Sequence, residues 1–184
     1  MTTVDGLPAH ILLVHAIVVL LPLAALLLVL SALWPAARGK LAGPNAVLSV
    51  LVVVLVPITT DAGEWLERRV ASTPLVRAHT ELGDTALFVA IPVTVLALVV
   101  WWRHREHLRT GATKTAGADP ASTATRRRTF LAPASTAVTA LIAVLAVMAA
   151  GAAVYDIYRI GDSGAQATWQ DQFSSAPASR APGR

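Results

Sequence analysis

The stretch ILLVHAIVVLLPLAALLLVLSAL, from Ile11 to Leu33, runs for 23 residues without one formal charge. At a rise of 1.5 Å per residue, about 20 apolar residues form a helix long enough to cross a bilayer. A secretory signal peptide has a basic start and a shorter apolar core of about 7 to 15 residues. Here the first basic residue is Arg38. The stretch therefore predicts a retained transmembrane helix.

Three further apolar blocks follow this first one along the chain. They cover Ala46–Thr60, about Leu82–Trp102, and Phe130–Tyr155, and the first and last of these carry no charge. Backbone groups in lipid must be hydrogen-bonded within their own segment, so these blocks are helices rather than strands. We predict an all-α fold, an integral membrane four-helix bundle within one domain, 1–169, with helices at about 8–34, 44–66, 74–102 and 130–158.

The composition supports a membrane protein and excludes several classes of site. The chain has 184 residues, of which 55% are hydrophobic and 14% charged, whereas soluble domains carry about 25% charged residues. It has no cysteine, which excludes disulfides, Fe–S clusters, c-type haem attachment and thiolate metal sites. There is no phosphate-binding loop, nucleophile elbow or HExxH motif, so the sequence gives little support to catalysis.

The basic residues predict the orientation. Nine of them flank the inner ends of the predicted helices, and six share the opposite side with nine of the eleven acids. The positive-inside rule then places both termini outside the cytoplasm. The net charge of +4 therefore reflects orientation, and we expect no nucleic-acid partner. We expect residues 110–125 to be a flexible cytoplasmic linker and residues 170–184 a disordered outer tail.

With this orientation, every helix brings histidine or carboxylate side chains to the outer layer of the membrane. They are His10 and His15, Asp61 and Glu64, His79 and Asp84, and Asp156 and Asp162. Ionisable groups at membrane depth are costly and usually face the bundle interior, where they mark functional sites. The layer is therefore the candidate site.

Counted from Ala46, the predicted second helix runs without a charge for only 15 residues, to Thr60, or roughly 22 Å, which is too short to span the core alone. It must include Asp61, and Glu64 lies three residues further on the same face. The alternative is that the bilayer thins and Glu64 pairs with Arg68 four residues later. The sequence leaves both interpretations open.

The positions of the histidines along the predicted helices limit which of them can bind one ligand together. His10 and His15 are five residues apart, or roughly 140° around a helix, so both cannot bind one small ion. Thr73 as an N-cap with Pro74 at the first helical position would place His79 inside the third helix. The alternative for each histidine is one structural hydrogen bond to a carbonyl or an acid across the bundle.

The third helix also has a face of small side chains below His79: Gly83, Ala86, Ala90, Thr94 and Ala97. Such a face lets a neighbouring helix approach closely, which is its more common use. It would also leave space beside the imidazole for a flat group.

Four short motifs resemble a bacterial membrane family catalogued as domain of unknown function 2231. They are Gly6-Leu7-Pro8-Ala9-His10 with Val14-His15-Ala16, then Gly63-Glu64-Trp65-Leu66-Glu67, His79-Thr80-Glu81-Leu82-Gly83-Asp84, and Arg159-Ile160-Gly161-Asp162-Ser163-Gly164-Ala165. The resemblance covers roughly residues 4–169. It implies a four-helix protein of the bacterial plasma membrane, without an established activity. Because some members are joined to redox modules, it also implies a link to electron transfer or haem.

The resemblance identifies His10, His15 and His79 as the motif histidines and Glu64 as the motif acid. This chain departs from the pattern at two positions. Ile11 stands where the pattern has proline, and Asp162 stands where it has histidine, which removes a histidine from the fourth helix. Aspartate is a poor haem ligand but binds iron, zinc or manganese.

Three functional hypotheses follow. The first is a cofactor protein, with one haem b between His15 and His79, and His10 nearby, or one divalent metal ion held by a subset of His10, His15, Glu64, His79 and Asp162. The alternative is a non-catalytic subunit or scaffold with a structural polar network. A proton or solute pathway ranks last, because the inner halves of the helices lack polar residues. The expected partners are the lipid bilayer and other membrane or redox proteins.

Overall fold

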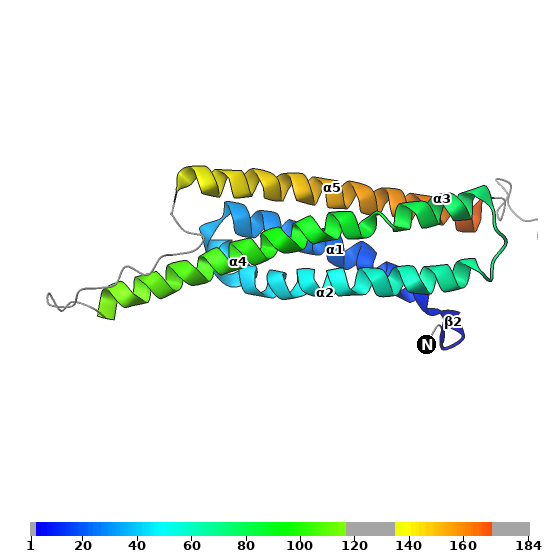
Figure 1. The fold of residues 1–184 in the computed structure, drawn as a ribbon, viewed down its shortest axis with the longest axis horizontal. Helices are drawn as coiled ribbons and strands as arrows, with labels where there is room; N and C mark the ends of the chain where they lie inside the picture. The colour runs from blue at the N-terminus through cyan, green and yellow to red at the C-terminus, as the bar shows by residue number, and fades with distance from the viewer. Residues whose placement is uncertain (1–2, 117–134, 171–184) are drawn as a thin grey trace, which may run out of the picture.

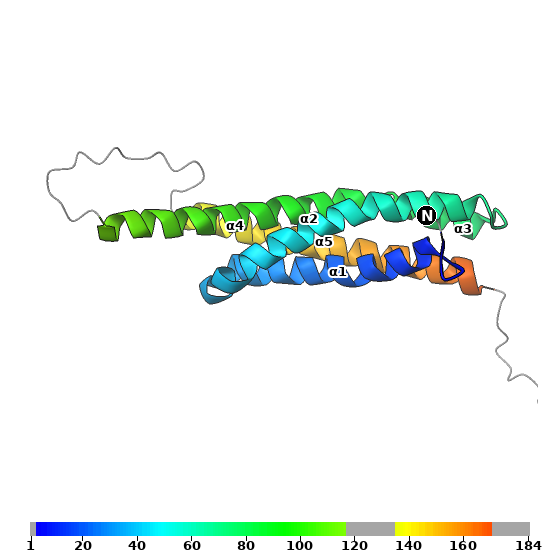
Figure 2. The same cartoon turned by 90° about the horizontal axis from the view of Figure 1, so that it is seen from below.

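Four antiparallel rods make up the structure, a computed structural model that describes residues 3–116 and 135–170. Figures 1 and 2 show an elongated bundle in which the chain runs from one end to the other and back twice. The elements are β1 (Thr3–Val4), β2 (Leu7–Pro8), α1 (Ala9–Leu33), α2 (Pro35–Glu67), α3 (Pro74–Gly83), α4 (Ala86–Ala116) and α5 (Thr136–Trp169). The two short strands form a hairpin directly before α1.

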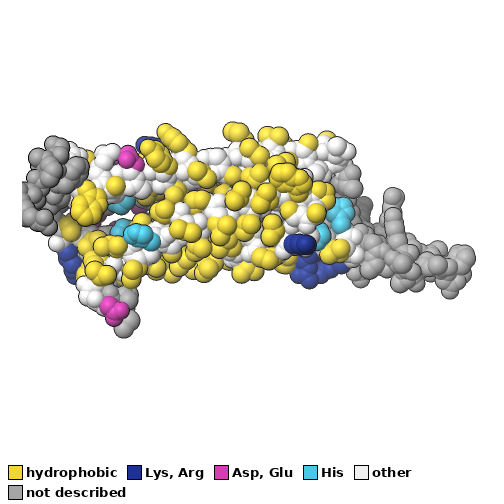
Figure 3. All heavy atoms as spheres, turned by 180° about the vertical axis from the view of Figure 1, so that it is seen from behind, with side chains coloured by type: hydrophobic (Ala, Val, Ile, Leu, Met, Phe, Trp, Pro, Cys, Tyr) yellow, Lys and Arg dark blue, Asp and Glu magenta, His cyan; other side chains and the backbone are white. Residues whose placement is uncertain are grey.

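Within the described residues, four segments are long and apolar enough to cross a membrane. They are Ala9–Leu33, Pro35–Glu67, Pro74–Arg109 and Thr136–Trp169. Figure 3 shows apolar side chains over the middle of the visible face, with charged side chains gathered towards the two ends. The predicted all-α, four-helix membrane bundle is confirmed. The end that faces the cytoplasm stays a prediction.

Small side chains fill the interior between the helices. Ala24, Ala90, Ala146 and Ala153 have no exposed surface, and they belong to one core cluster with larger side chains such as Leu21. Without a hydrophobic driving force between helices in lipid, close backbone approach and van der Waals contact hold a bundle together. The small face predicted for the third helix is buried at Ala86, Ala90, Thr94 and Ala97, as close packing requires.

One hydrogen bond joins α4 to α2 inside this core. The hydroxyl of Thr94 lies 3.0 Å from the carbonyl oxygen of Ser49 and 2.9 Å from that of Ala90. Because a buried hydroxyl must find an acceptor, this contact favours one register between the two helices.

Several boundaries differ from those predicted. Helix α2 begins at Pro35 instead of about residue 44, and Trp34 alone separates it from α1. Proline suits the first helical position, because its missing N–H has no partner there in any helix. Arg38 therefore lies in the first turns of α2 and not in a loop. Pro44, at the predicted start of this helix, lies inside α2.

The later boundaries also shift. The predicted third helix, 74–102, consists of α3 and α4 with a break at Asp84 and Thr85, and α4 continues to Ala116. The prediction of a linker is therefore wrong for residues 110–116, and residues 117–125 lie outside the described part of the chain. Helix α5 runs from Thr136 to Trp169, beyond the predicted end at 158. The predicted tail, apart from Gln170, lies outside the described residues.

The start of α3 agrees with the sequence. Thr73 is the N-cap, its hydroxyl oxygen accepts from the backbone N–H of Val76 at 3.2 Å, and Pro74 is the first helical residue. The break after α3 has a side-chain contact of its own. The hydroxyl of Thr85 donates to Asp156 on α5 at 2.8 Å. These contacts determine where α3 lies against α5.

Adjacent alanines on α5 provide a test of the packed interior. Ala153 is fully buried and Ala152 is exposed. We expect Ala153→Leu to destabilise the bundle by about 1–3 kcal/mol, because the added atoms overpack a close helix interface. Ala152→Leu should change stability by less than about 0.5 kcal/mol. Thermal unfolding in detergent measures both, and equal effects would contradict the arrangement of α5.

Candidate functional site

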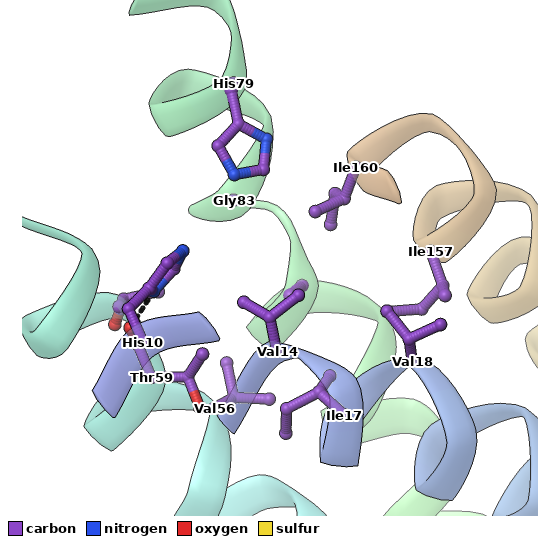
Figure 4. A pocket seen from close by; sticks show the side chains of 12 residues that line it. His10, Val14, Ile17, Val18, Val56, Thr59, His79, Gly83, Ile157 and Ile160 are labelled. Carbon is purple, nitrogen blue, oxygen red and sulfur yellow. Dashed lines mark hydrogen bonds between the residues drawn. The ribbon is translucent and has the colours of Figure 1, made fainter. Parts of the chain in front are cut away.

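Two imidazoles meet at the end of the bundle where α1 begins, α2 ends, α3 lies and α5 ends. His10 is the second residue of α1, and His79 lies in the middle of α3. Their ring centres are 6.3 Å apart and their planes are at 75°. Figure 4 shows the two rings directed toward each other across a cavity. The pair is formed by residues 69 positions apart in the sequence.

His10 is held by α2. Its Nδ1 lies 2.9 Å from the backbone carbonyl oxygen of Thr59. A carbonyl oxygen only accepts, so Nδ1 carries the proton and donates it. The ring also lies against the backbone of Gly63, where a Cβ would be only 2.9 Å from its Cε1 and Nδ1 atoms. A glycine at position 63 is therefore required for the imidazole to lie where it does.

His79 is held by α5 in the same manner. Its Nδ1 lies 3.0 Å from the hydroxyl oxygen of Ser163, and that hydroxyl donates its own proton to the carbonyl oxygen of Ile160 at 2.9 Å. Ser163 must then accept from His79, so Nδ1 again carries the proton. A Cβ on Gly164 would lie 2.9 Å from Cε1 of His79. Each imidazole thus rests on a glycine of a neighbouring helix.

These contacts determine the tautomer of both rings. With Nδ1 protonated in a neutral imidazole, Nε2 carries the lone pair. Neither Nε2 atom of His10 and His79 has a hydrogen-bond partner among the described residues. The site therefore presents two unpaired imidazole lone pairs to one space. In metal proteins, ligating histidines donate their other N–H to a carbonyl or a similar acceptor in this way.

The space between the rings is small and mostly apolar. It has a volume of about 50 Å³, enough for a few water-sized groups. Val14 and Ile17 of α1, Val56 of α2 and Ile157 of α5 form much of its wall. No carboxylate lines it.

His15 requires a correction. It is exposed on α1, and its Nδ1 donates to the carbonyl oxygen of Ile11 at 2.6 Å within the same helix. It does not line the cavity. The predicted haem pair of His15 and His79 is therefore not the pair that the fold brings together, because the rotation of α1 turns His10 inward and His15 outward. The hydrogen bond of His15 stays within α1 and does not cross the bundle.

The predicted metal set is likewise not assembled. Glu64 is exposed and forms an ion pair with Arg68 at 3.7 Å, the alternative arrangement considered from the sequence. Asp162 is exposed and accepts a hydrogen bond from Gln166 at 2.9 Å. Asp61 is also exposed. Across residues 3–116 and 135–170, no three histidine, cysteine or acidic side chains lie close enough to hold a metal ion.

A buried carboxylate lies nearby on α5. Asp156 is only 8% exposed; one of its oxygens accepts from Thr85, and the other has no partner among the described residues. The sequence placed it in the outer layer but not in the candidate set. Thr85, Ser163 and the two glycines that support the imidazoles were not identified as site residues. The one sequence feature that pointed to these residues was the presence of both glycines in the motifs of the family resemblance.

Comparisons with known proteins identify no relative. No family model, curated protein or solved structure matches the chain. The resemblance to domain of unknown function 2231 therefore stays a prediction, and the site is interpreted from its own geometry.

Two glycines of α5 should change the stability of the protein in opposite directions when each is replaced by alanine. Gly164→Ala should destabilise the protein by about 1–3 kcal/mol, because the new methyl displaces the His79 ring and its hydrogen bond to Ser163. Gly161→Ala places its methyl in open space and should stabilise α5 by up to about 1 kcal/mol. Thermal unfolding of the two variants checks the sign. A stabilised Gly164→Ala variant would rule out the close contact with His79.

Proposed function

We propose that this multi-pass membrane protein binds one Cu(I) ion between Nε2 of His10 and Nε2 of His79. The observation that carries the proposal is the pair of lone pairs directed into one cavity, each set by a hydrogen bond at Nδ1. A first-row metal lies about 2.0–2.1 Å from an imidazole nitrogen, so two imidazoles sharing it in line have ring centres about 6–6.5 Å apart. The observed separation of 6.3 Å agrees.

The surroundings favour a monovalent ion with two ligands. Zinc and other divalent ions take four or more ligands, commonly with thiolates or carboxylates. Here the acids of the predicted metal set are exposed, and the cavity wall is mainly apolar. A single charge with two neutral ligands costs less to bury than a double charge. Imidazole is an established copper ligand, and Cu(I) accepts linear two-coordination.

Haem b does not fit this cavity. Pockets for ligands of drug size or larger have volumes of about 300 Å³ or more, against about 50 Å³ here. The predicted haem ligand His15 also lies outside the cavity. To use it as a ligand with His79, α1 and α3 would have to rearrange. A copper ion would still allow the redox role implied by the resemblance, because copper exchanges one electron between Cu(I) and Cu(II).

The location and partners complete the proposal. We propose that the histidine end faces the outside of a bacterial plasma membrane, which the basic residues at the other end of the described chain, such as Arg38, Arg103 and Arg105, support. The lipid bilayer is the immediate environment. Other membrane or redox proteins that receive or deliver the ion are the proposed partners.

Metal loading tests the proposal directly. Detergent-purified protein is loaded anaerobically with Cu(I), competed with a Cu(I) chelator and analysed for metal. We expect one copper per chain, and we expect His10→Gln and His79→Gln each to weaken binding at least about tenfold, because each removes one of two ligands. Parallel loading with Zn(II) and an absorbance spectrum in the Soret region test the divalent ion and haem.

His15→Gln is the matched control, since it removes a histidine of α1 that lies outside the cavity. It should leave copper binding unchanged. Copper binding that is lost equally in His15→Gln, or absent from the wild type, would refute the site.

A structural scaffold is the second candidate. The observation in its favour is that both Nδ1 hydrogen bonds cross between helices, α1 to α2 and α3 to α5. Under this function, His10→Gln and His79→Gln lower the temperature of unfolding, and the wild type retains no metal.

A further inference from the structure

A second recess lies at the opposite end of the bundle, where Figure 3 shows Lys and Arg side chains gathered. It is lined by Arg38 of α2, Arg103 and His107 of α4, and Thr139 of α5, with apolar side chains between them. No acidic side chain lines it. Residues of α1, α2, α4 and α5 line it, so it lies between the helices at this end of the bundle.

Arg38 is oriented by the end of α1. Its Nε donates to the carbonyl oxygen of Ser31 at 2.8 Å, and its Nη2 donates to that of Ala32 at 2.7 Å. These are among the last carbonyls of α1, which have no partner within their own helix. The contacts use two of the five N–H groups of the guanidinium. The other three have no partner among the described residues.

Arg103 is buried more deeply. Only 7% of the residue is exposed, and its single hydrogen bond within the described part of the chain runs from Nη2 to the hydroxyl of Thr139 at 3.3 Å. Four of its five N–H groups therefore lack a partner there. None of its nitrogen atoms is fully enclosed without a partner, so the unpaired N–H groups stay accessible and can donate to a ligand.

The two guanidiniums also repel each other. Arg38 and Arg103 line the same recess, and neither has a carboxylate partner among the described residues. Like charges in one recess repel each other, and an anion bound between them would offset both. Arginine is the side chain best suited to phosphate, which it binds through a planar fork of donors.

We propose that this recess binds the phosphate group of an anionic membrane lipid. The recess holds about 20 Å³, room for one or two phosphate oxygens while the remainder of the ligand stays outside. Exposed Trp34 and Trp102 flank this end of the bundle, and such aromatic residues lie at the level of lipid headgroups. Basic pockets between transmembrane helices bind lipid phosphates in this setting. The proposal does not depend on the histidine site.

Native mass spectrometry of the full-length protein, released from a neutral detergent, tests this. The protein is titrated with phosphatidylglycerol or with phosphatidylcholine of the same acyl chains. We expect one phosphatidylglycerol per chain at concentrations where phosphatidylcholine binds at least tenfold less. Arg103→Gln should reduce phosphatidylglycerol binding at least tenfold. Arg105→Gln should change it less than twofold, because Arg105 is exposed and lies over the Trp101 ring.

Other outcomes overturn the proposal. Equal binding of the two lipids, or equal losses in Arg103→Gln and Arg105→Gln, would show that only general charge attracts the lipid. Inorganic phosphate that binds alone and displaces the lipid would identify a free anion as the ligand. If Arg103→Gln does not fold, Arg103→Lys retains the charge without the fork and should still lose binding severalfold. The comparison of the two lipids on the wild type decides the question without any variant.

Discussion

Close approach of the helices is the constraint on which the rest of this structure depends. In lipid, apolar side chains gain little by leaving their surroundings, so helices associate through short-range contact between small residues. Ala24, Ala90 and Ala153 allow that contact in the core. The same principle acts at the histidine end, where Gly63 and Gly164 provide the surfaces on which the imidazoles rest. A larger side chain at any of these positions would separate the helices or displace a ring.

Part of this fold could be predicted from features of neighbouring residues in the sequence. Four apolar blocks of sequence define the four helical segments that can cross a membrane, because crossing a bilayer requires about 20 apolar residues and internal backbone hydrogen bonds. Thr73 and Pro74 define the start of α3, because capping depends on neighbouring residues alone. From that start, the position of His79 inside the helix follows. The gathering of polar groups at one end also follows. In an antiparallel four-helix bundle, the starts of the first and third helical segments lie beside the ends of the second and fourth.

The partner of His79 could not be predicted, because it depends on how α1 is rotated about its axis. The helix is apolar on all sides, so no polar face indicates which of His10 and His15 turns inward. Glu64 shows the same limit, since pairing with Arg68 on its own helix and pairing across the bundle are equally compatible with the sequence. The supporting glycines act only through contacts with residues far along the chain, which spacing does not reveal.

The two histidines belong to different halves of the bundle. His10 is held through α1 and α2, by the carbonyl of Thr59, whereas His79 is held through α3 and α5, by Ser163. Thr85 and Asp156 add a further contact between the α3–α4 break and α5. The space between the rings is therefore the seam between two helix pairs, each of which positions its own imidazole. A ligand that bridges both Nε2 atoms must join the halves. Its binding then depends on how the two pairs lie against each other, and it stabilises that arrangement in return.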